Sequence, residues 1–170
     1  DGETDYRLQQ LQAAPVYYCP LDEAANVAMR AAWTRLTQGA AAQSCVLRVQ
    51  GRDLRIEREA AGVARFGFEE LCARPLGAAD YLAIAGRFHT VLLEDVPVMT
   101  ADKRNEAKRF VTLIDALYEA KAKLVMSAAA EPSQLYPAGD GNFEFERTAS
   151  RLIEMRSEAY LSADRIELAD

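Results

Sequence analysis

Apolar residues follow a helical period most clearly between residues 102 and 120. Four of them fall at positions i, i+3, i+4 and i+7 of one helix face: Phe110, Leu113, Ile114 and Leu117. This predicted helix lies between two runs rich in apolar residues, 89–95 and 123–127, each typical of a buried strand. A strand, a long helix and a second strand form a βαβ unit, whose crossover is nearly always right-handed. We therefore expect the two strands to lie parallel in one sheet.

A second region of the chain alternates apolar and polar residues. Residues 45–49 and 54–58 alternate in this way, and Gly51-Arg52-Asp53 lies between them, which predicts a hairpin with a tight turn. A third extended segment, residues 62–66, is expected to join the hairpin. The pattern predicts one small antiparallel sheet with arginines on its solvent-exposed face.

The first 40 residues give weaker signals. Residues 1–15 show no clear period, and residues 16–20 predict a short strand that ends at a proline. A helix is predicted over residues 24–36, because its apolar positions are close to helical spacing. Asp22 is the expected N-cap of this helix, and Gly39 is expected to stop it.

The C-terminal part of the chain predicts further helices. Two short helices are expected over residues 68–72 and 77–85. Residues 143–146 alternate Phe and Glu, which predicts a short extended approach to a last helix over residues 147–161. The apolar side of that helix is expected to carry Leu152, Ile153, Met155 and Tyr160. The tail up to residue 170 is expected to be a helix end or a frayed end.

Together these elements predict an α/β fold in which a βαβ unit forms a small parallel sheet, with an antiparallel hairpin and flanking helices. A length of 170 residues favours one domain. Within it we expect an entry strand and helix over residues 1–40 and a hairpin region over residues 43–67. The helix pair, the βαβ unit and the terminal helix are expected over residues 68–162.

Composition narrows the classes of function. No apolar run approaches the roughly 20 residues that span a bilayer. A net charge of −6 argues against a nucleic-acid surface, which needs a dense basic patch. The three cysteines have no metal-ligand or redox spacing and there is one histidine, so no metal site is predicted. The first residues are acidic, unlike a signal peptide, and no initiator Met is present, so we expect the chain to be cut from a longer protein.

Acidic residues at the end of a buried strand are the first candidate for chemistry. Glu94 and Asp95 follow Val91-Leu92-Leu93, and such acids can hold magnesium in P-loop enzymes. The phosphate-binding loop G-x-x-x-x-G-K-[S/T] that such a site needs is absent from this sequence. Two interpretations stay open: a structural strand end with an acidic loop, or a site that faces a ligand.

Arg147 and Arg151 are the second candidate. They stand four residues apart at the predicted start of the last helix, so both project from one face. Two guanidinium groups on one face can grip a phosphate. The alternative is ion pairing with carboxylates, either Glu144 or a residue across a packed interface.

The predicted long helix carries a third candidate, the basic pairs Lys103-Arg104 and Lys108-Arg109. A charge-rich helix face is most often solvated and held by weak ion pairs, and the alternative is a contact with a subunit or partner. His89, alone before a buried strand, is expected to be a packed or capping residue.

Seven segments follow one another in a recognisable order over nearly the whole chain: residues 5–7, 68–72, 75–81, 88–99, 104–118, 123–128 and 143–155. Together they resemble the ZapE (AFG-like) family of P-loop ATPases. It implies that the chain is the C-terminal half of an AAA+-related ATPase that uses ATP and Mg²⁺. In the family, the phosphate loop and the main magnesium-binding acid lie in the N-terminal half, so this chain is not expected to hydrolyse ATP alone.

The resemblance also implies a function for the parent protein. Bacterial members of the family are cytoplasmic cell-division factors that act on FtsZ rings, and mitochondrial relatives resemble protein-quality-control factors. Arg147 and Arg151 would then sense the nucleotide phosphate. Arg104 and Arg109 would contact a neighbouring subunit of a homo-oligomer. The parent protein would act close to a membrane without a membrane-spanning segment in this chain. The alternative is a non-catalytic protein-docking module, with residues 45–58 as its docking surface.

Overall fold

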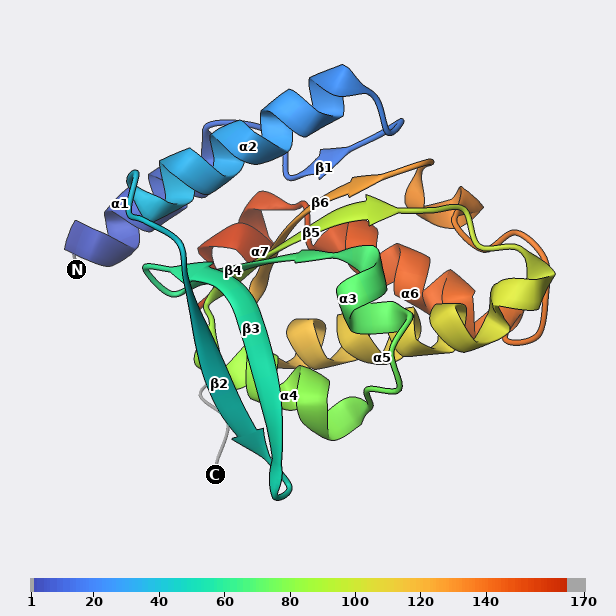
Figure 1. Ribbon diagram of the computed structural model, residues 1–170. Helices are drawn as coiled ribbons and strands as arrows, with labels where there is room; N and C mark the ends of the chain where they lie inside the picture. Colours follow the sequence, from blue (N-terminus) through green and yellow to red (C-terminus); the bar gives the residue numbers. More distant parts are fainter. Residues whose placement is uncertain (1, 165–170) are drawn as a thin grey trace.

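The computed structural model describes residues 2–164, which form a single six-stranded sheet flanked by helices (Figure 1). The strand order is β1-β6-β5-β4-β3-β2. The first four strands in this order are parallel, and β3 and β2 continue the sheet in antiparallel fashion. The strands are β1 (Tyr17–Tyr18), β2 (Gln43–Val49), β3 (Arg52–Ala60), β4 (Val63–Gly67), β5 (Thr90–Val96) and β6 (Lys123–Ala128).

The helices form a layer on each face of this sheet (Figure 1). On one face lie α1 (Gly2–Gln12) and α2 (Glu23–Thr37). On the other lie α3 (Phe68–Cys72), α4 (Ala78–Arg87), α5 (Arg104–Ala120) and α6 (Asn142–Glu154). The chain also forms the short helix α7 (Glu158–Ser162) and the 3₁₀ turns η1 (Ala101–Lys103) and η2 (Pro132–Gln134).

Burial on both faces explains the continuous apolar runs of β5 and β6. Leu92 and Val125 pack in the smaller core under α1 and α2, whereas Val91, Leu93 and Met126 pack in the larger core against the opposite helices. The predicted βαβ unit is confirmed, because β5 and β6 are parallel and joined by α5. The four apolar side chains predicted to share one face of α5 are all buried.

The expected small antiparallel sheet is wrong in one respect. Strand β4 pairs with β3 but also lies parallel to β5, so the hairpin extends the main sheet and does not form a sheet of its own. Val63 and Ala64 are fully buried in the two different cores, which keeps β4 in the interior. The hairpin turns at Gln50 and Gly51, which both have positive φ, so β3 already begins at Arg52.

The N-terminal region holds a helix that the sequence pattern missed. Helix α1 covers most of a segment without clear apolar period, and among those of its residues whose burial the structure describes, Leu11 is the one buried in the core. Asp22 caps α2 as predicted, because its Oδ1 accepts the Ala25 N–H at 2.8 Å. Gln38, with a positive φ, ends that helix just before Gly39.

The predicted extended segment at residues 143–146 is also wrong. Helix α6 begins at Asn142, with Phe145 buried in the core and Phe143 exposed. It ends at Glu154, and the predicted last helix continues only as the separate helix α7. Ile153 is 56% exposed and does not belong to the apolar side. The predicted helix end or frayed end after residue 164 lies outside the described residues.

Among the described residues, no helix has both the length and the apolar character that crossing a membrane requires.

Candidate functional site

Three of the four candidate arginines, Arg104, Arg147 and Arg151, lie along the line where α5 and α6 meet. The two helices run side by side in the same direction (Figure 1), and three polar contacts join them with the same offset of 36 residues. These contacts are Arg104 with Asp140, Asp115 with Arg151, and Tyr118 with Glu154. We call this line, from Asp140 to Glu154 on one side and from Arg104 to Glu119 on the other, the α5–α6 seam.

Asp115 holds both candidate arginines in the middle of the seam. The guanidinium of Arg151 donates a hydrogen bond to its Oδ1, and Arg147 Nη2 lies 3.5 Å from its Oδ2. Arg151 also stacks over the Tyr118 ring, 4.7 Å from the ring centroid, and faces Glu119 at 3.7 Å. The carboxylate that pairs with the arginines is therefore Asp115, and no ion pair with Glu144 occurs among the described residues.

The two arginines differ in how freely they can move. The side chain of Arg151 is 20% exposed, whereas that of Arg147 is 57% exposed. Two guanidiniums around one carboxylate form the same kind of charge-assisted contact that they would form around a phosphate. Arg147 can reach an external anion at small cost, and Arg151 is fixed by its packing. Their assignment as phosphate sensors stays a prediction.

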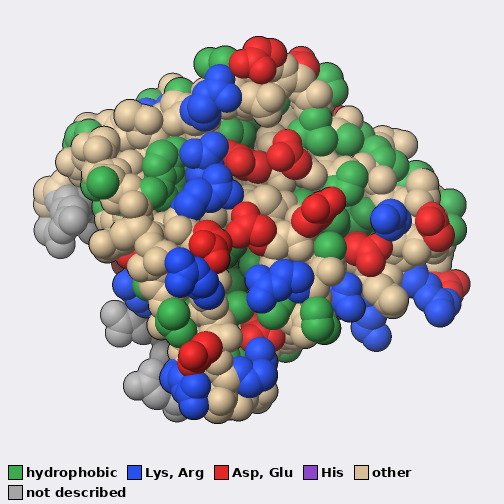
Figure 2. Space-filling view, viewed as in Figure 1, with side chains coloured by type: hydrophobic (Ala, Val, Ile, Leu, Met, Phe, Trp, Pro, Cys, Tyr) green, Lys and Arg blue, Asp and Glu red, His purple; other side chains and the backbone are tan. Residues whose placement is uncertain are grey.

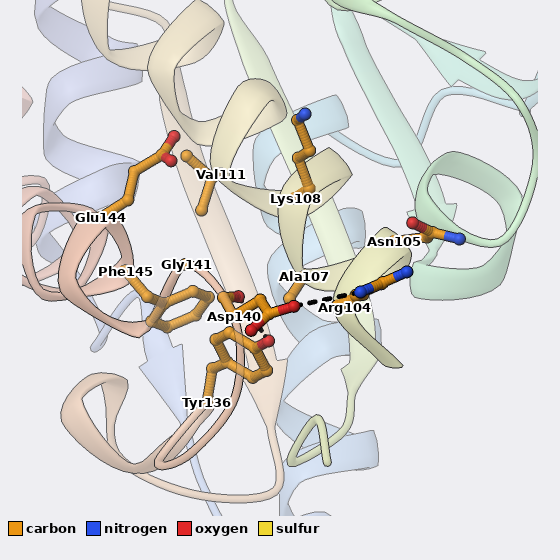
Figure 3. Close-up of a pocket in the computed structure, with 10 residues that line it drawn as sticks. All are labelled: Arg104, Asn105, Ala107, Lys108, Val111, Tyr136, Asp140, Gly141, Glu144 and Phe145. Carbon is orange, nitrogen blue, oxygen red and sulfur yellow. Dashed lines mark hydrogen bonds and ion pairs between the residues drawn. The ribbon is translucent and has the colours of Figure 1, made fainter. Parts of the chain in front are cut away.

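A pocket opens at the N-terminal end of the seam (Figure 3). Its volume is about 370 Å³, and side chains of α5, α6 and the loop before α6 line it. Arg104 lies at the rim, where its guanidinium donates to Asp140 Oδ2 at 3.0 Å. The Tyr136 hydroxyl donates to the Asp140 carbonyl at 2.6 Å and fixes the loop. The predicted subunit-contact role of Arg104 is untested, but its position at a pocket is compatible with it.

Arg109 lies on the side of α5 that faces α3, away from the seam. Its Nη1 donates to the Cys72 carbonyl at 3.0 Å, at the C-terminal end of α3, and lies 4.0 Å from Glu106. A cation at a helix C-terminus is favourable because it neutralises the unpaired carbonyls. This contact gives Arg109 a local structural partner, and its predicted role in a subunit contact stays a prediction.

The acids at the end of β5 form no site of their own. Glu94 pairs with Arg65 at 2.7 Å, and both side chains are largely buried. Asp95 is exposed, has a positive φ of 63°, and its N–H donates to Ser127 Oγ at 3.0 Å. Among the described residues there is no group of three or more potential metal ligands. The geometry favours the structural strand end over the site that faces a ligand.

His89 is packed against the turn before β4, as predicted. Its Nε2 lies 3.0 Å from the Ala61 carbonyl and its Nδ1 lies 2.8 Å from Thr90 Oγ1. The neighbouring Gly62 has a positive φ of 79°, and a Cβ there would lie 2.6 Å from the histidine ring. The ring therefore needs a glycine at this position.

Two functional-looking residues were missed by the sequence patterns. Asp115 lies on the long helix, 32 and 36 residues before the arginines that it binds, and no local spacing signals this pairing. Lys123 begins β6 but is buried, and its Nζ donates to the carbonyls of Tyr160 and Ala163 at 2.7 Å. Burial lowers the pKa of Lys123 to about 8, with a smaller effect from Lys121. The position of Lys123 in an apolar run was the sequence signal that could have indicated its burial.

The sheet and its helix layers define a mixed α/β protein that is consistent with a P-loop-related fold. The profile of the AFG1-like ATPase family matches residues 1–164. The chain therefore belongs to the AFG1-like ATPase family, as the sequence resemblance implied.

Curated relatives agree with this assignment. The chain is 37% identical to the cell division protein ZapE of Escherichia coli K12 over 169 residues, which is 98% of this chain and 44% of that protein. The match to ZapE of Escherichia coli O157:H7 has the same values. It is 33% identical to the lactation elevated protein 1 homolog B of Danio rerio, over 97% of this chain and 40% of that protein. The chain thus spans less than half the length of these relatives, and no solved structure matches it.

Proposed function

We propose that this chain is the C-terminal part of an ATP-hydrolysing protein that remodels protein assemblies during cell division. The family match supports an ATPase, and the name of the bacterial relatives, cell division protein ZapE, supports a role in cell division. FtsZ rings in the cytoplasm are the proposed target, by resemblance to that family. Mg²⁺ and ATP are the proposed cofactors of the whole protein.

The proposed division of labour follows from the residues present. The sequence has no phosphate-binding loop, so another part of the parent protein must hold the triphosphate and its metal. This chain contributes the positively charged side chains of Arg147 and Arg151 to the nucleotide site. A loose phosphoryl-transfer transition state is stabilised by cations near its equatorial oxygens.

The observation that carries the proposal is the pairing of Arg147 and Arg151 on a single carboxylate of the seam. In the parent protein, Arg147 would exchange Asp115 for the nucleotide phosphate, and Arg151 would stay on Asp115 and keep α6 in place. Asp115 would be the resting counterion of Arg147, so the positive charge is held in one orientation before nucleotide arrives.

ATP turnover measured on three samples tests the proposal. The full-length parent should hydrolyse ATP in the presence of Mg²⁺, the 170-residue chain alone should not, and the parent without this chain should lose most of its turnover. Turnover by the isolated chain, or full turnover by the parent without it, would refute the division of labour.

A second candidate function is that of a protein-docking module, and the hairpin favours it. Helix α4 packs against β2 on one face of the hairpin, and within the described residues 2–164 no helix is seen over the other face (Figure 1). On the side seen in Figure 2, basic and acidic side chains intermix in a band over this region. They include the ion pairs Arg48–Asp53 and Arg55–Glu57, and Val46 is exposed beside them.

Surface substitutions test docking better than deletion of the hairpin, because Leu54 and Ile56 of β3 belong to the main core. Val46→Asp should weaken binding of the parent to FtsZ at least about tenfold and leave ATP turnover unchanged. Leu82→Asp, an exposed apolar position on α4, is the matched control. Equal FtsZ affinity of the Val46 variant and the wild type would exclude the hairpin as the docking surface.

A further inference from the structure

Lys123, the first residue of β6, carries its charge inside the protein. It is 6% exposed, and its ammonium lies 4.7 Å from the centroid of the Tyr160 ring. The ammonium donates to the carbonyls of Tyr160 and Ala163, which are polar but neutral. Among residues 2–164 no carboxylate forms an ion pair with it. Burying a charge is costly unless an opposite charge lies beside it, so this position favours an anion.

The charges around Lys123 increase the cost of its burial. Burial has the largest effect on its pKa, and Lys121 and Arg7 lower the pKa further. Asp164 acts in the opposite direction, with the smallest of these effects. The electrostatic field around the ammonium is therefore positive, which favours a negative ligand.

A small pocket lies beside Lys123, at the amino ends of β5 and β6. Its volume is about 220 Å³. It is lined by Arg7, Leu8 and Leu11 of α1, by His89 and Lys123, and by residues 161–164. Arg7 is partly buried, and within the described part of the chain its guanidinium forms no ion pair. Two cations without a carboxylate partner there, Arg7 and Lys123, thus line one pocket.

The walls of this pocket are held in place by the fold. Leu11 and Leu161 belong to the smaller core, and both ring nitrogens of His89 form hydrogen bonds. Lys123 is fixed by its two carbonyl contacts. A preformed pocket smaller than those that take cofactors or drug-sized ligands suits a ligand of a few heavy atoms.

We infer that this pocket binds a small oxyanion of the phosphate or sulfate class, held between Lys123 and Arg7. A guanidinium presents paired donors that match two oxygens of such an ion. The ammonium has three N–H groups, of which two serve the carbonyls, so one is left for an oxygen. The apolar walls lower the local dielectric constant and strengthen both contacts.

This oxyanion site is separate from the nucleotide site of the proposed function. A nucleoside triphosphate is too large for a pocket of about 220 Å³. In open α/β sheets, nucleotides bind outside the carboxyl ends of the parallel strands. The pocket of Lys123 lies at the opposite edge of the sheet, and it contains none of the seam arginines.

Anion binding at this site depends on the proton of Lys123. The pKa of Lys123 is about 8, and a bound anion stabilises the charged form and raises that pKa. By linkage, the affinity for the anion is highest below pH 8 and falls as the pH rises above 8. The other titratable groups around the ammonium are Arg7, Lys121, His89, Tyr160 and Asp164. Burial raises the pKa of Tyr160, so its hydroxyl is neutral in this range.

Isothermal titration calorimetry of the 170-residue chain with sodium phosphate, at pH 7 and constant ionic strength, tests the inference. The wild type should bind one phosphate with a Kd of roughly 0.1–1 mM. Lys123→Met, which keeps the length of the side chain without its charge, and Arg7→Gln should each weaken binding more than about 10-fold. Arg30→Gln is the matched control, an exposed arginine of α2 outside the pocket, and should leave the Kd unchanged.

Sulfate separates the protonation of the protein from that of the ligand, because its charge is constant from pH 7 to 10. Its affinity for the wild type should fall at least about 10-fold over this range. The pKa of the Lys123 ammonium, followed by NMR, should rise from about 8 towards its ordinary value of 10.5 in saturating sulfate. This titration and Arg7→Gln keep the test valid if Lys123→Met does not fold.

Four results would overturn the inference. These are no phosphate binding up to about 10 mM, equal binding by the wild type and Arg7→Gln, an equal loss in Arg30→Gln, and a pKa of Lys123 that sulfate does not change. None of them depends on ATP turnover, so the proposed function can fail or hold separately.

Discussion

Asp115 shows at the scale of single residues why the candidate site could be predicted only in part. The four-residue spacing of Arg147 and Arg151 correctly places them on one helix face, and ion pairing was one of the two open interpretations. Their counterion could not be found from local spacing, because it depends on how α5 and α6 pack. Arg104 and Arg109 both follow a lysine in the sequence, yet one reaches Asp140 and the other reaches Cys72.

We expect Asp115→Asn to lower the free energy of unfolding by about 1–2 kcal/mol, because it weakens two charge-assisted contacts on a partly exposed carboxylate. Glu119→Gln is the matched control on the same helix and should cost less than about 0.5 kcal/mol, because its contact with Arg151 is long and exposed. Urea denaturation of both variants measures the difference. Equal effects would show that Asp115 has no special part in holding the arginines.

The lowered pKa of Lys123 leads us to expect that the free energy of unfolding depends on pH. Its pKa is about 8 in the folded protein, because burial disfavours the charge, and returns to its ordinary value of 10.5 on unfolding. Between these values the unfolded state binds a proton that the folded state has lost, so stability rises with pH. Below pH 8 the lysine is charged in both states and its effect on stability is constant.

The free energy of unfolding of the wild type, relative to Lys123→Met, should therefore rise by roughly 1–3 kcal/mol as the pH increases from 8 towards 10.5. Chemical denaturation at several pH values measures this difference. Lys103→Met, at an exposed position, should show no such pH dependence relative to the wild type. A difference between wild type and Lys123→Met that stays constant from pH 7 to 10 would contradict the assignment.

At the scale of elements, the presence of most helices and strands was predicted better than the pairing of the strands and the first and last residues of each element. The strands, the hairpin and the long helix followed from apolar periodicity, because burial imposes that periodicity directly. The parallel neighbour of β4 did not, since alternation within a strand says nothing about which strand lies beside it. The start of α6 was missed because Phe143 and Phe145 alternate as in a strand, although only one of them is buried.

A buried contact joins the hairpin to α4. Asp80 is 2% exposed, and its carboxylate accepts the Gly77 N–H at 2.9 Å and the Arg52 guanidinium at 2.8 Å. Asp80→Ala should lower the free energy of unfolding by about 2–3 kcal/mol, because it removes a helix cap and a charged hydrogen bond. Arg52→Ala should cost about 1 kcal/mol or less, since its side chain is half exposed. Equal losses in urea denaturation would mean that the cap contributes little.

At the scale of the whole molecule, the proposed function requires a site that is shared between two parts of one protein. The chain belongs to an ATPase family, spans less than half the length of the relatives named above, and has no phosphate-binding loop in its sequence. Its candidate arginines lie on the outer line between two helices, where an external phosphate can approach Arg147. The sequence resemblance predicted the family. The geometry of the α5–α6 seam could not be predicted from the sequence, because it depends on how the two helices pack in the folded chain.

ATP turnover by the full-length parent carrying Arg147→Ala or Arg151→Ala tests this claim most directly. Arg55→Ala, an exposed arginine of the hairpin that also has a carboxylate partner, is the matched control. We expect kcat to fall at least about 100-fold in the Arg147 variant, which loses the cation at the phosphate. The Arg151 variant should lose less, because Arg151 keeps α6 in place and does not leave Asp115. The control should keep the wild-type rate, and the melting temperature of the Arg147 variant should stay close to that of the wild type. A wild-type kcat in well-folded Arg147 and Arg151 variants would contradict the account.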